Sequence, residues 1–123
     1  MRDDPSPAND VGRHGEDLAL LHLESLGFTL VERNARVGRA EIDLVVRDAG
    51  GFAFVEVKTR RTARHGEPWA AVDTAKRVRL ERAAVRYLER VGEPDADWRL
   101  GVVAIVVDAD GAITNLDWID EVS

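Results

Sequence analysis

Apolar residues recur along this chain with two different periods, which predict helices alternating with strands. From Gly12 to Leu26, one apolar stripe at helical spacing predicts a helix, and Gly27 is a natural C-cap. A second helix is predicted from an N-cap at Asp73 to about Gly92, with its own apolar stripe. Between and after the helices, short β-rich runs bounded by turn residues predict five strands, the second and third forming a hairpin around 48–51. The predicted strands are 28–33, 41–47, 52–59, 99–107 and 112–119, with 34–39 as a loop or an irregular continuation of the first.

The order of these elements predicts the fold class. Helix, three strands, helix and two strands imply an α/β domain with a mixed β-sheet flanked by helices, in the order α-β-β-β-α-β-β. A helix between the third and fourth strands indicates a right-handed parallel crossover. Residues 1–10 are polar and contain Pro5 and Pro7, so they are predicted to form a disordered tail, which leaves 11–123 as a single domain.

Composition narrows the classes of protein. The chain has no cysteine, which excludes disulfides, thiolate metal sites and a thiol nucleophile. No segment approaches the roughly 20 apolar residues of a membrane span, and the N-terminus lacks a signal-peptide pattern, so a cytoplasmic protein without a membrane partner is expected. The net charge is −6, but residues 33–90 carry fourteen basic and eight acidic side chains. That local excess of basic charge is compatible with a nucleic-acid partner.

Acidic residues stand inside two segments that otherwise resemble buried strands. Because side chains alternate along a strand, Asp43 lies on one face of its strand, and Glu56 and Lys58 share one face of theirs. A turn centred on 49–50 places Asp43 opposite Glu56. A turn at 50–51 places Asp43 opposite Lys58, with Glu56 on the diagonal. Either register gathers the three groups on one face of the hairpin.

This grouping suggests metal-dependent chemistry. Two neighbouring carboxylates repel each other, and a divalent cation such as Mg²⁺ or Mn²⁺, held by Asp43 and Glu56, would compensate them. Such an ion lowers the pKa of a bound water, and Lys58 could pair with a scissile phosphate or orient that water. The chain has two lysines against fifteen arginines, so a lysine here suggests a need for a compact ammonium group. The alternative is a structural ion pair of Lys58 with Asp43 or Glu56.

The motifs GRHGEDLAL, ERNARV, EIDLV and FVEVKTR, with the later Lys76, resemble the YraN-like family of uncharacterised bacterial proteins over about residues 11–107. That family looks related to Holliday-junction resolvases of the PD-(D/E)xK nuclease superfamily. The resemblance implies a restriction-endonuclease-like core and metal-dependent DNA cleavage. By position, Asp43 and Glu56 match the metal carboxylates, Lys58 matches the catalytic lysine, and Glu16 matches an acidic residue that often completes the site. An acid in a first helical turn is also favoured by the helix dipole alone.

Two positions depart from the family pattern. Ala40 stands where the family usually has glycine before its EID motif. Gly101, in Arg99-Leu100-Gly101, stands where the family usually has aspartate. Neither change removes a predicted metal ligand, but loss of the aspartate would weaken an auxiliary contact.

Basic side chains around the motif are candidates for phosphate contacts, which would make binding strongly salt-dependent. A solvated loop is the alternative for the three arginines after the motif, and Lys76 could instead extend to solvent from the edge of the core. Trp69 could stack on a base, although closing the core is favoured. The predicted nucleic-acid contacts are Arg36, Arg60, Arg61, Arg64 and Lys76.

The sequence thus favours a metal-dependent endonuclease-like domain acting on DNA, with branched and single-stranded DNA as candidate substrates. A non-catalytic nucleic-acid-binding or assembly module on the same fold is the competing hypothesis. A third is a protein-interaction domain whose acids and Lys58 form an ion-paired structural face. Cleavage of two strands needs two sites, which makes a homodimer attractive.

Overall fold

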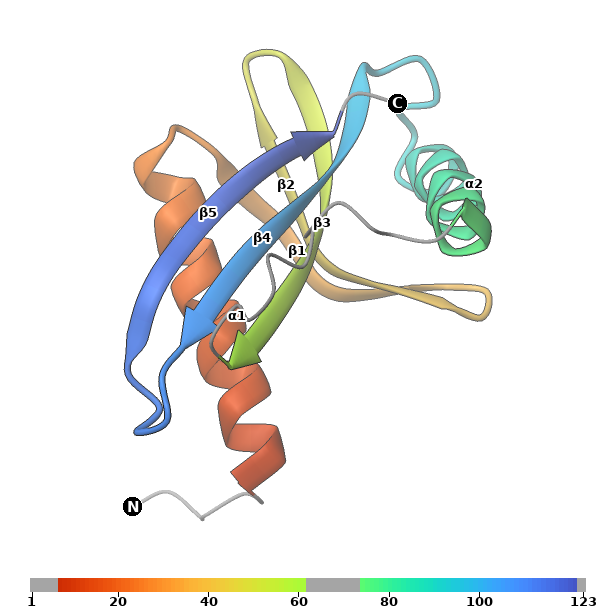
Figure 1. Ribbon diagram of the computed structural model, residues 1–123. Helices are drawn as coiled ribbons and strands as arrows, with labels where there is room; N and C mark the ends of the chain where they lie inside the picture. Colours follow the sequence, from red (N-terminus) through yellow and green to blue (C-terminus); the bar gives the residue numbers. More distant parts are fainter. Residues whose placement is uncertain (1–6, 62–73, 122–123) are drawn as a thin grey trace, which may run out of the picture.

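A computed structural model describes residues 7–61 and 74–121 of the chain (Figure 1). Its element order is the predicted one, two helices and a five-stranded mixed sheet, so the predicted fold class is confirmed. The elements are α1 (Pro7–Ser25), β1 (Thr29–Val37), β2 (Ala40–Asp48), β3 (Gly51–Arg61), α2 (Thr74–Arg90), β4 (Trp98–Val107) and β5 (Ile113–Glu121). Within these residues, no helix is both long enough and apolar enough to cross a membrane.

The strands lie in the sheet in chain order, β1-β2-β3-β4-β5. All neighbours are antiparallel except β3 and β4, which run parallel from Phe52↔Trp98 to Arg61↔Val107. A parallel pair cannot be joined by a tight turn, so the chain between them must cross over the sheet, and it does so through α2. The predicted crossover is therefore present.

Each helix covers one face of the sheet. Ala19 and Leu23 of α1 pack on a cluster that includes Leu44 and Val55, whereas Tyr87 of α2 belongs to a cluster with Phe54. Consecutive residues of β3 thus contribute to opposite cores, as strand alternation requires. The sheet forms the middle layer of three, with α1 and α2 on its two sides (Figure 1).

Several boundaries differ from prediction. The helix α1 begins at Pro7 rather than Gly12, so it takes in part of the predicted tail; proline is favoured at the first helical position because its missing N–H would be unpaired there. The strand β1 continues to Val37, so residues 34–37 extend the first strand rather than form a loop. Its pairing with β2 has a register shift between Leu30 and Glu32. Leu26 and Val91, at the ends of the two predicted apolar stripes, are exposed because each follows the last helical turn.

The β2–β3 hairpin adopts the first of the two predicted registers. Its pairs include Leu44↔Val55 and Asp48↔Gly51, which centres the turn on Ala49 and Gly50. Beyond Leu44↔Val55 the pairing stops, and β2 continues with β1 while β3 continues with β4. Figure 1 shows the β1–β2 hairpin leaving β3 and passing beside α2. We call the point where the two strands part the fork.

Gly101 of β4 has a packing reason for lacking a side chain. A Cβ placed there would lie 2.0 Å from Cη2 of Trp118, so the indole occupies the space that a side chain would need. Trp118 in turn makes an edge contact with Phe28, at 5.6 Å between ring centroids. The indole of Trp118 in β5 thus occupies the space where an aspartate side chain at position 101 would lie.

Candidate active site

The fork explains why an aspartate can stand inside β2. Where the strands part, the backbone N–H of Val57 in β3 has no carbonyl partner in β2 and donates instead to Oδ2 of Asp43, at 2.8 Å. A buried backbone N–H left unpaired would destabilise the fold, so this hydrogen bond gives Asp43 a structural role as well as a candidate chemical one.

Asp43 is held in surroundings that disfavour its charge. The pKa of its carboxyl group is raised from 3.8 to about 6, mainly by burial and against the lowering effect of the hydrogen bond from Val57. The negative charges of Glu16, Glu56 and Glu41 contribute to this rise. Three acidic side chains thus disfavour the ionised form of Asp43, and a bound cation would offset this repulsion.

Glu56 lies on β3 with its side chain 20% exposed. Its Oε2 accepts a hydrogen bond from Nζ of Lys76 in α2, and its Oε1 is buried without a hydrogen-bond partner. Both Asp43 and Glu56 line a cavity of about 30 Å³ between β2, β3 and α2. Both charged and apolar side chains line this cavity, and its size is sufficient for one water molecule or a small ion.

These carboxylates fit a divalent cation. Among residues 7–61 and 74–121, no cluster of three or more histidines and acids is arranged to hold a metal alone. Mg²⁺, however, commonly uses one or two carboxylates and completes its shell with water and phosphate oxygens. The unpaired Oε1 of Glu56 and the raised pKa of Asp43 supply two such ligands beside one cavity.

The two lysines near the carboxylates differ in their contacts. Lys58 is partly buried on β3 and makes no hydrogen bond or ion pair within the described residues, so neither of the structural ion pairs considered for it is formed there. Lys76, predicted as a phosphate contact, instead pairs with Glu56. Its position four residues before Leu80, on the buried side of α2, is the signal that pointed toward the sheet.

Glu16 approaches the same acids from α1. Its carboxylate accepts from Nδ2 of Asn34 at 3.3 Å and from Nη2 of Arg33 at 3.5 Å, and its side chain is 19% exposed. Its charge reaches Asp43, whose pKa it raises. The structure therefore brings Glu16 into the electrostatic neighbourhood of the site but gives it partners on β1.

The predicted arginines are spread over several places. Arg36 is exposed on β1, where its carbonyl accepts a hydrogen bond from Arg90 of α2 at 2.8 Å. Arg60 and Arg61, at the end of β3, line a separate cavity of about 280 Å³ together with Leu18 of α1. Arg64 and Trp69 lie outside the described residues.

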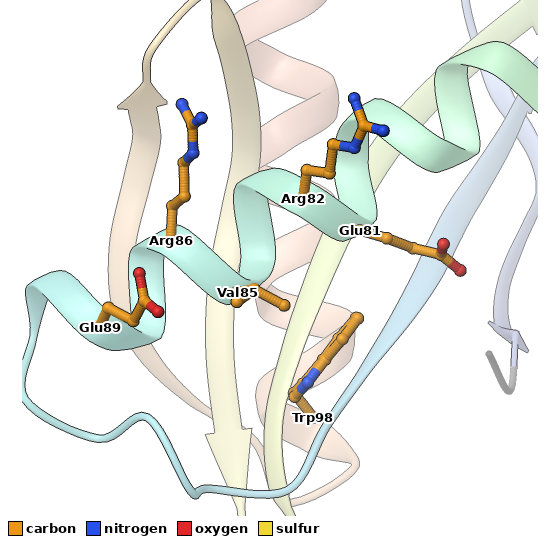
Figure 2. A pocket seen from close by; sticks show the side chains of 6 residues that line it. All are labelled: Glu81, Arg82, Val85, Arg86, Glu89 and Trp98. Atoms are coloured by element: carbon orange, nitrogen blue, oxygen red, sulfur yellow. The ribbon is translucent and has the colours of Figure 1, made fainter.

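A further candidate binding site, on the outer surface of α2, was not predicted from the sequence. A shallow groove of about 630 Å³ runs there, with arginines, glutamates and an aromatic ring around it (Figure 2). The spacing of arginines at i, i+3 and i+7 from position 79 was the available signal. The residues that line this groove, called the α2 groove below, are Glu81, Arg82, Val85, Arg86, Glu89 and Trp98.

Comparison with known proteins places these observations in a family. The family model described as uncharacterised protein family UPF0102 matches residues 15–105. The chain belongs to the UPF0102 family. This confirms the predicted YraN-like membership, and the matched segment contains Glu16, Asp43, Glu56 and Lys58.

UPF0102 proteins from distant bacteria are similar to this chain. The one from Solibacter usitatus is 50% identical over 103 residues, which cover 80% of this chain and 76% of that protein. The one from Geobacter sulfurreducens is 43% identical over 97 residues, covering 79% and 76%. The one from Dechloromonas aromatica is 43% identical over 116 residues, covering 91% and 90%.

Among solved structures, SfsA of Pyrococcus furiosus, in complex with Ca²⁺, aligns with a TM-score of 0.45 and 15% identity. The alignment covers 92% of this chain but 63% of SfsA, so the chain spans less than two thirds of that protein.

Proposed function

We propose that this domain is a metal-dependent nuclease that hydrolyses phosphodiester bonds in DNA, with branched or single-stranded DNA as its substrate. The observation that carries the proposal is the pair of carboxylates at the fork. Asp43 has a raised pKa and Glu56 has a buried, unpaired oxygen, and both border one small cavity. Structural acids are usually neutralised by neighbours, whereas Asp43 has no cationic partner among the described residues and one oxygen of Glu56 has no hydrogen-bond donor there.

Asp43 and Glu56 would hold Mg²⁺ or Mn²⁺. When bound, such an ion would activate water and stabilise the negative charge that develops on the phosphate in the transition state. The chain's own part is to present these two oxygens at a fixed separation on adjoining strands. Lys58, two residues beyond Glu56 on β3, supplies an ammonium group for the scissile phosphate or the attacking water.

Lys76 gives Glu56 a positive partner when no metal is bound. A cation that binds Glu56 must therefore compete with the ammonium group of Lys76. This contact also favours the second candidate function, a nucleic-acid-binding or assembly module without hydrolysis, because an ion pair within the chain can replace a metal permanently.

A cleavage assay distinguishes the two functions. Labelled duplex, single-stranded, flapped and four-way-junction DNA would be incubated with the full chain in Mn²⁺, Mg²⁺ or EDTA, and RNA of the same sequence would be run in parallel. We expect cleavage with Mn²⁺ or Mg²⁺ only, and its loss in Lys58→Ala. Because Lys58 makes no ion pair within the described residues, this variant should retain its melting temperature.

Arg47→Gln serves as the control, since Arg47 pairs with Glu93 at the turn end of β2 and its loss also removes one positive charge. The absence of cleavage on every substrate, with unchanged DNA binding by Lys58→Ala, would reject hydrolysis and favour the binding module. Cleavage that persists in EDTA would reject the metal.

A further inference from the structure

The α2 groove has two chemically different edges. Figure 2 shows Arg82 and Arg86 extending from α2 in the same direction, with Val85 at the centre and Glu81 and Trp98 on the other side. Glu89 closes one end. The groove of about 630 Å³ is within the size range of sites that bind small molecules or single residues of a polymer.

Its two arginines are available to a partner. Arg82 and Arg86 are exposed, and neither forms a hydrogen bond or ion pair within the part of the chain that the structure describes. By contrast, Arg77 of α2 pairs with Glu81, which lines the groove, and Arg47 pairs with Glu93. In a chain of net charge −6, two adjacent arginines without an acidic partner mark a local site for an anion.

The apolar part of the groove suits a flat group. Val85 is 45% exposed and gives the groove an apolar surface. Trp98 contacts Phe54 edge-on, with 6.0 Å between the ring centroids, and Trp98 also lines the groove. An aromatic side chain beside guanidinium groups is the combination that holds a base and its phosphate together.

We propose that the α2 groove binds one strand of nucleic acid, with its phosphates on Arg82 and Arg86 and a base against Val85 and Trp98. The acidic end favours a single strand over a duplex, because Glu89, which forms no ion pair within the described residues, would repel a second sugar–phosphate backbone. The carboxylate of Glu89 can also accept hydrogen bonds from base amino groups. The proposal rests on the proposed function in taking nucleic acid as the partner, and it narrows the substrate to DNA with an unpaired segment.

The groove also leads toward the carboxylates. Arg79 stands about one helical turn before Arg82 and one turn after Lys76, which pairs with Glu56 at the fork. From Lys76 to Arg82 the helix advances about 9 Å. A strand held on Arg82 and Arg86 can therefore continue along α2 toward the cavity that Asp43 and Glu56 border.

Binding is tested separately from cleavage, in the full chain carrying Asp43→Asn and in EDTA. Fluorescence anisotropy would follow a labelled single-stranded oligonucleotide and a duplex of the same length. We expect tighter binding of the single strand. In Arg82→Gln/Arg86→Gln we expect at least tenfold weaker binding and a salt slope of log K reduced by about 1.4, the value for two lost phosphate contacts on a single strand.

Two further variants sharpen the test. Arg47→Gln removes one positive charge from an arginine outside the groove lining, which pairs with Glu93, and it should change binding much less than Arg82→Gln or Arg86→Gln alone. Trp98→Phe should weaken binding about fivefold or more and remove the quenching of tryptophan emission that the oligonucleotide causes. If Trp98→Phe is unfolded by circular dichroism, the exposed arginine pair still decides the question.

The possible failures are distinguishable. If Arg82→Gln/Arg86→Gln binds the single strand as tightly as the parent does, the proposed role of the groove is rejected, even if the parent chain cleaves DNA. Equal affinity of the parent for the duplex and the single strand also rejects it. Groove-dependent binding without any cleavage leaves the groove intact and rejects the nuclease. Binding of phosphatidylserine vesicles through the same arginines, with none of the oligonucleotide, overturns the groove in favour of a membrane surface.

Discussion

Two aspartates on the same strand, five residues apart, are in opposite electrostatic states. At the turn end of β2, Asp48 accepts hydrogen bonds from Arg99 at 3.2 Å and from the backbone N–H of Gly50 at 2.9 Å. Although burial acts to raise its pKa, these donors lower it overall. At the fork, Asp43 has one backbone donor and three acidic neighbours, and its pKa rises to about 6.

The difference separates an acid whose charge is compensated within the fold from one whose charge is disfavoured there. Arg99 lies between Asp48 and Asp120 and compensates both. Among the described residues no cationic side chain pairs with Asp43, and Lys76 pairs with Glu56. Identical substitutions at positions 43 and 48 should therefore have opposite consequences.

The largest difference should be in catalysis. Asp43→Asn removes a metal ligand that contributes several kcal/mol to transition-state stabilisation, so cleavage should fall about a thousandfold. Asp48→Asn should leave the rate within about threefold of the parent. The measurement is initial cleavage rate on the preferred DNA in Mn²⁺. Equal losses in the two variants would mean that the fork has no special role.

A divalent ion should stabilise the fork and not the turn. With Mn²⁺ at about 100 times its dissociation constant, the free energy of unfolding should rise by about 2.7 kcal/mol. The rise should disappear in Asp43→Asn and persist in Asp48→Asn, as measured by thermal melting with increasing Mn²⁺. A rise that survives in Asp43→Asn would place the ion elsewhere.

Without metal, Asp43 should destabilise the protein at neutral pH. A carboxyl whose folded pKa is raised favours the fold below its unfolded pKa of 3.8, and this contribution is lost as the pH rises toward about 6. Asp43→Asn, which keeps an acceptor for Val57, should therefore gain about 2 kcal/mol of unfolding free energy at pH 7 in EDTA. Urea denaturation at pH 7 and pH 4 should show the gain shrinking on acidification; a constant gain would contradict the raised pKa.

The smallest effect should have the opposite sign. Asp48→Asn weakens two hydrogen bonds to a charged acceptor at a partly exposed site, so unfolding free energy at pH 7 should fall by about 1 kcal/mol. Because the folded pKa of Asp48 is lowered, its contribution is present above 3.8 and lost as the pH falls below that value. Urea denaturation at pH 7 would show the opposite sign, and an added measurement at pH 2.5 would show the loss of the Asp48 contribution; an unfolding free energy unchanged by Asp48→Asn at pH 7 would contradict this prediction.

Element order and the placement of Asp43 and Glu56 on one face of the hairpin could be predicted from sequence, because strand periodicity is a local signal. The hairpin register could only be narrowed to two alternatives, because turns at 49–50 and at 50–51 were both compatible with the sequence. The fork could not be predicted, because it depends on β2 staying with β1 while β3 stays with β4. The partner of Glu56 was missed for a related reason. Local spacing places Lys76 on the inner side of α2, but only the packing of α2 on the sheet decides what it reaches.

The position of Trp118 over Gly101 has an evolutionary consequence. With the indole 2.0 Å from where a Cβ would be, an aspartate cannot appear at position 101 while tryptophan occupies position 118. The two positions should therefore change together during divergence, and a smaller residue at 118 should come first. Relatives that carry an acid at the position of Gly101 are expected to lack a large aromatic residue at the facing position of β5.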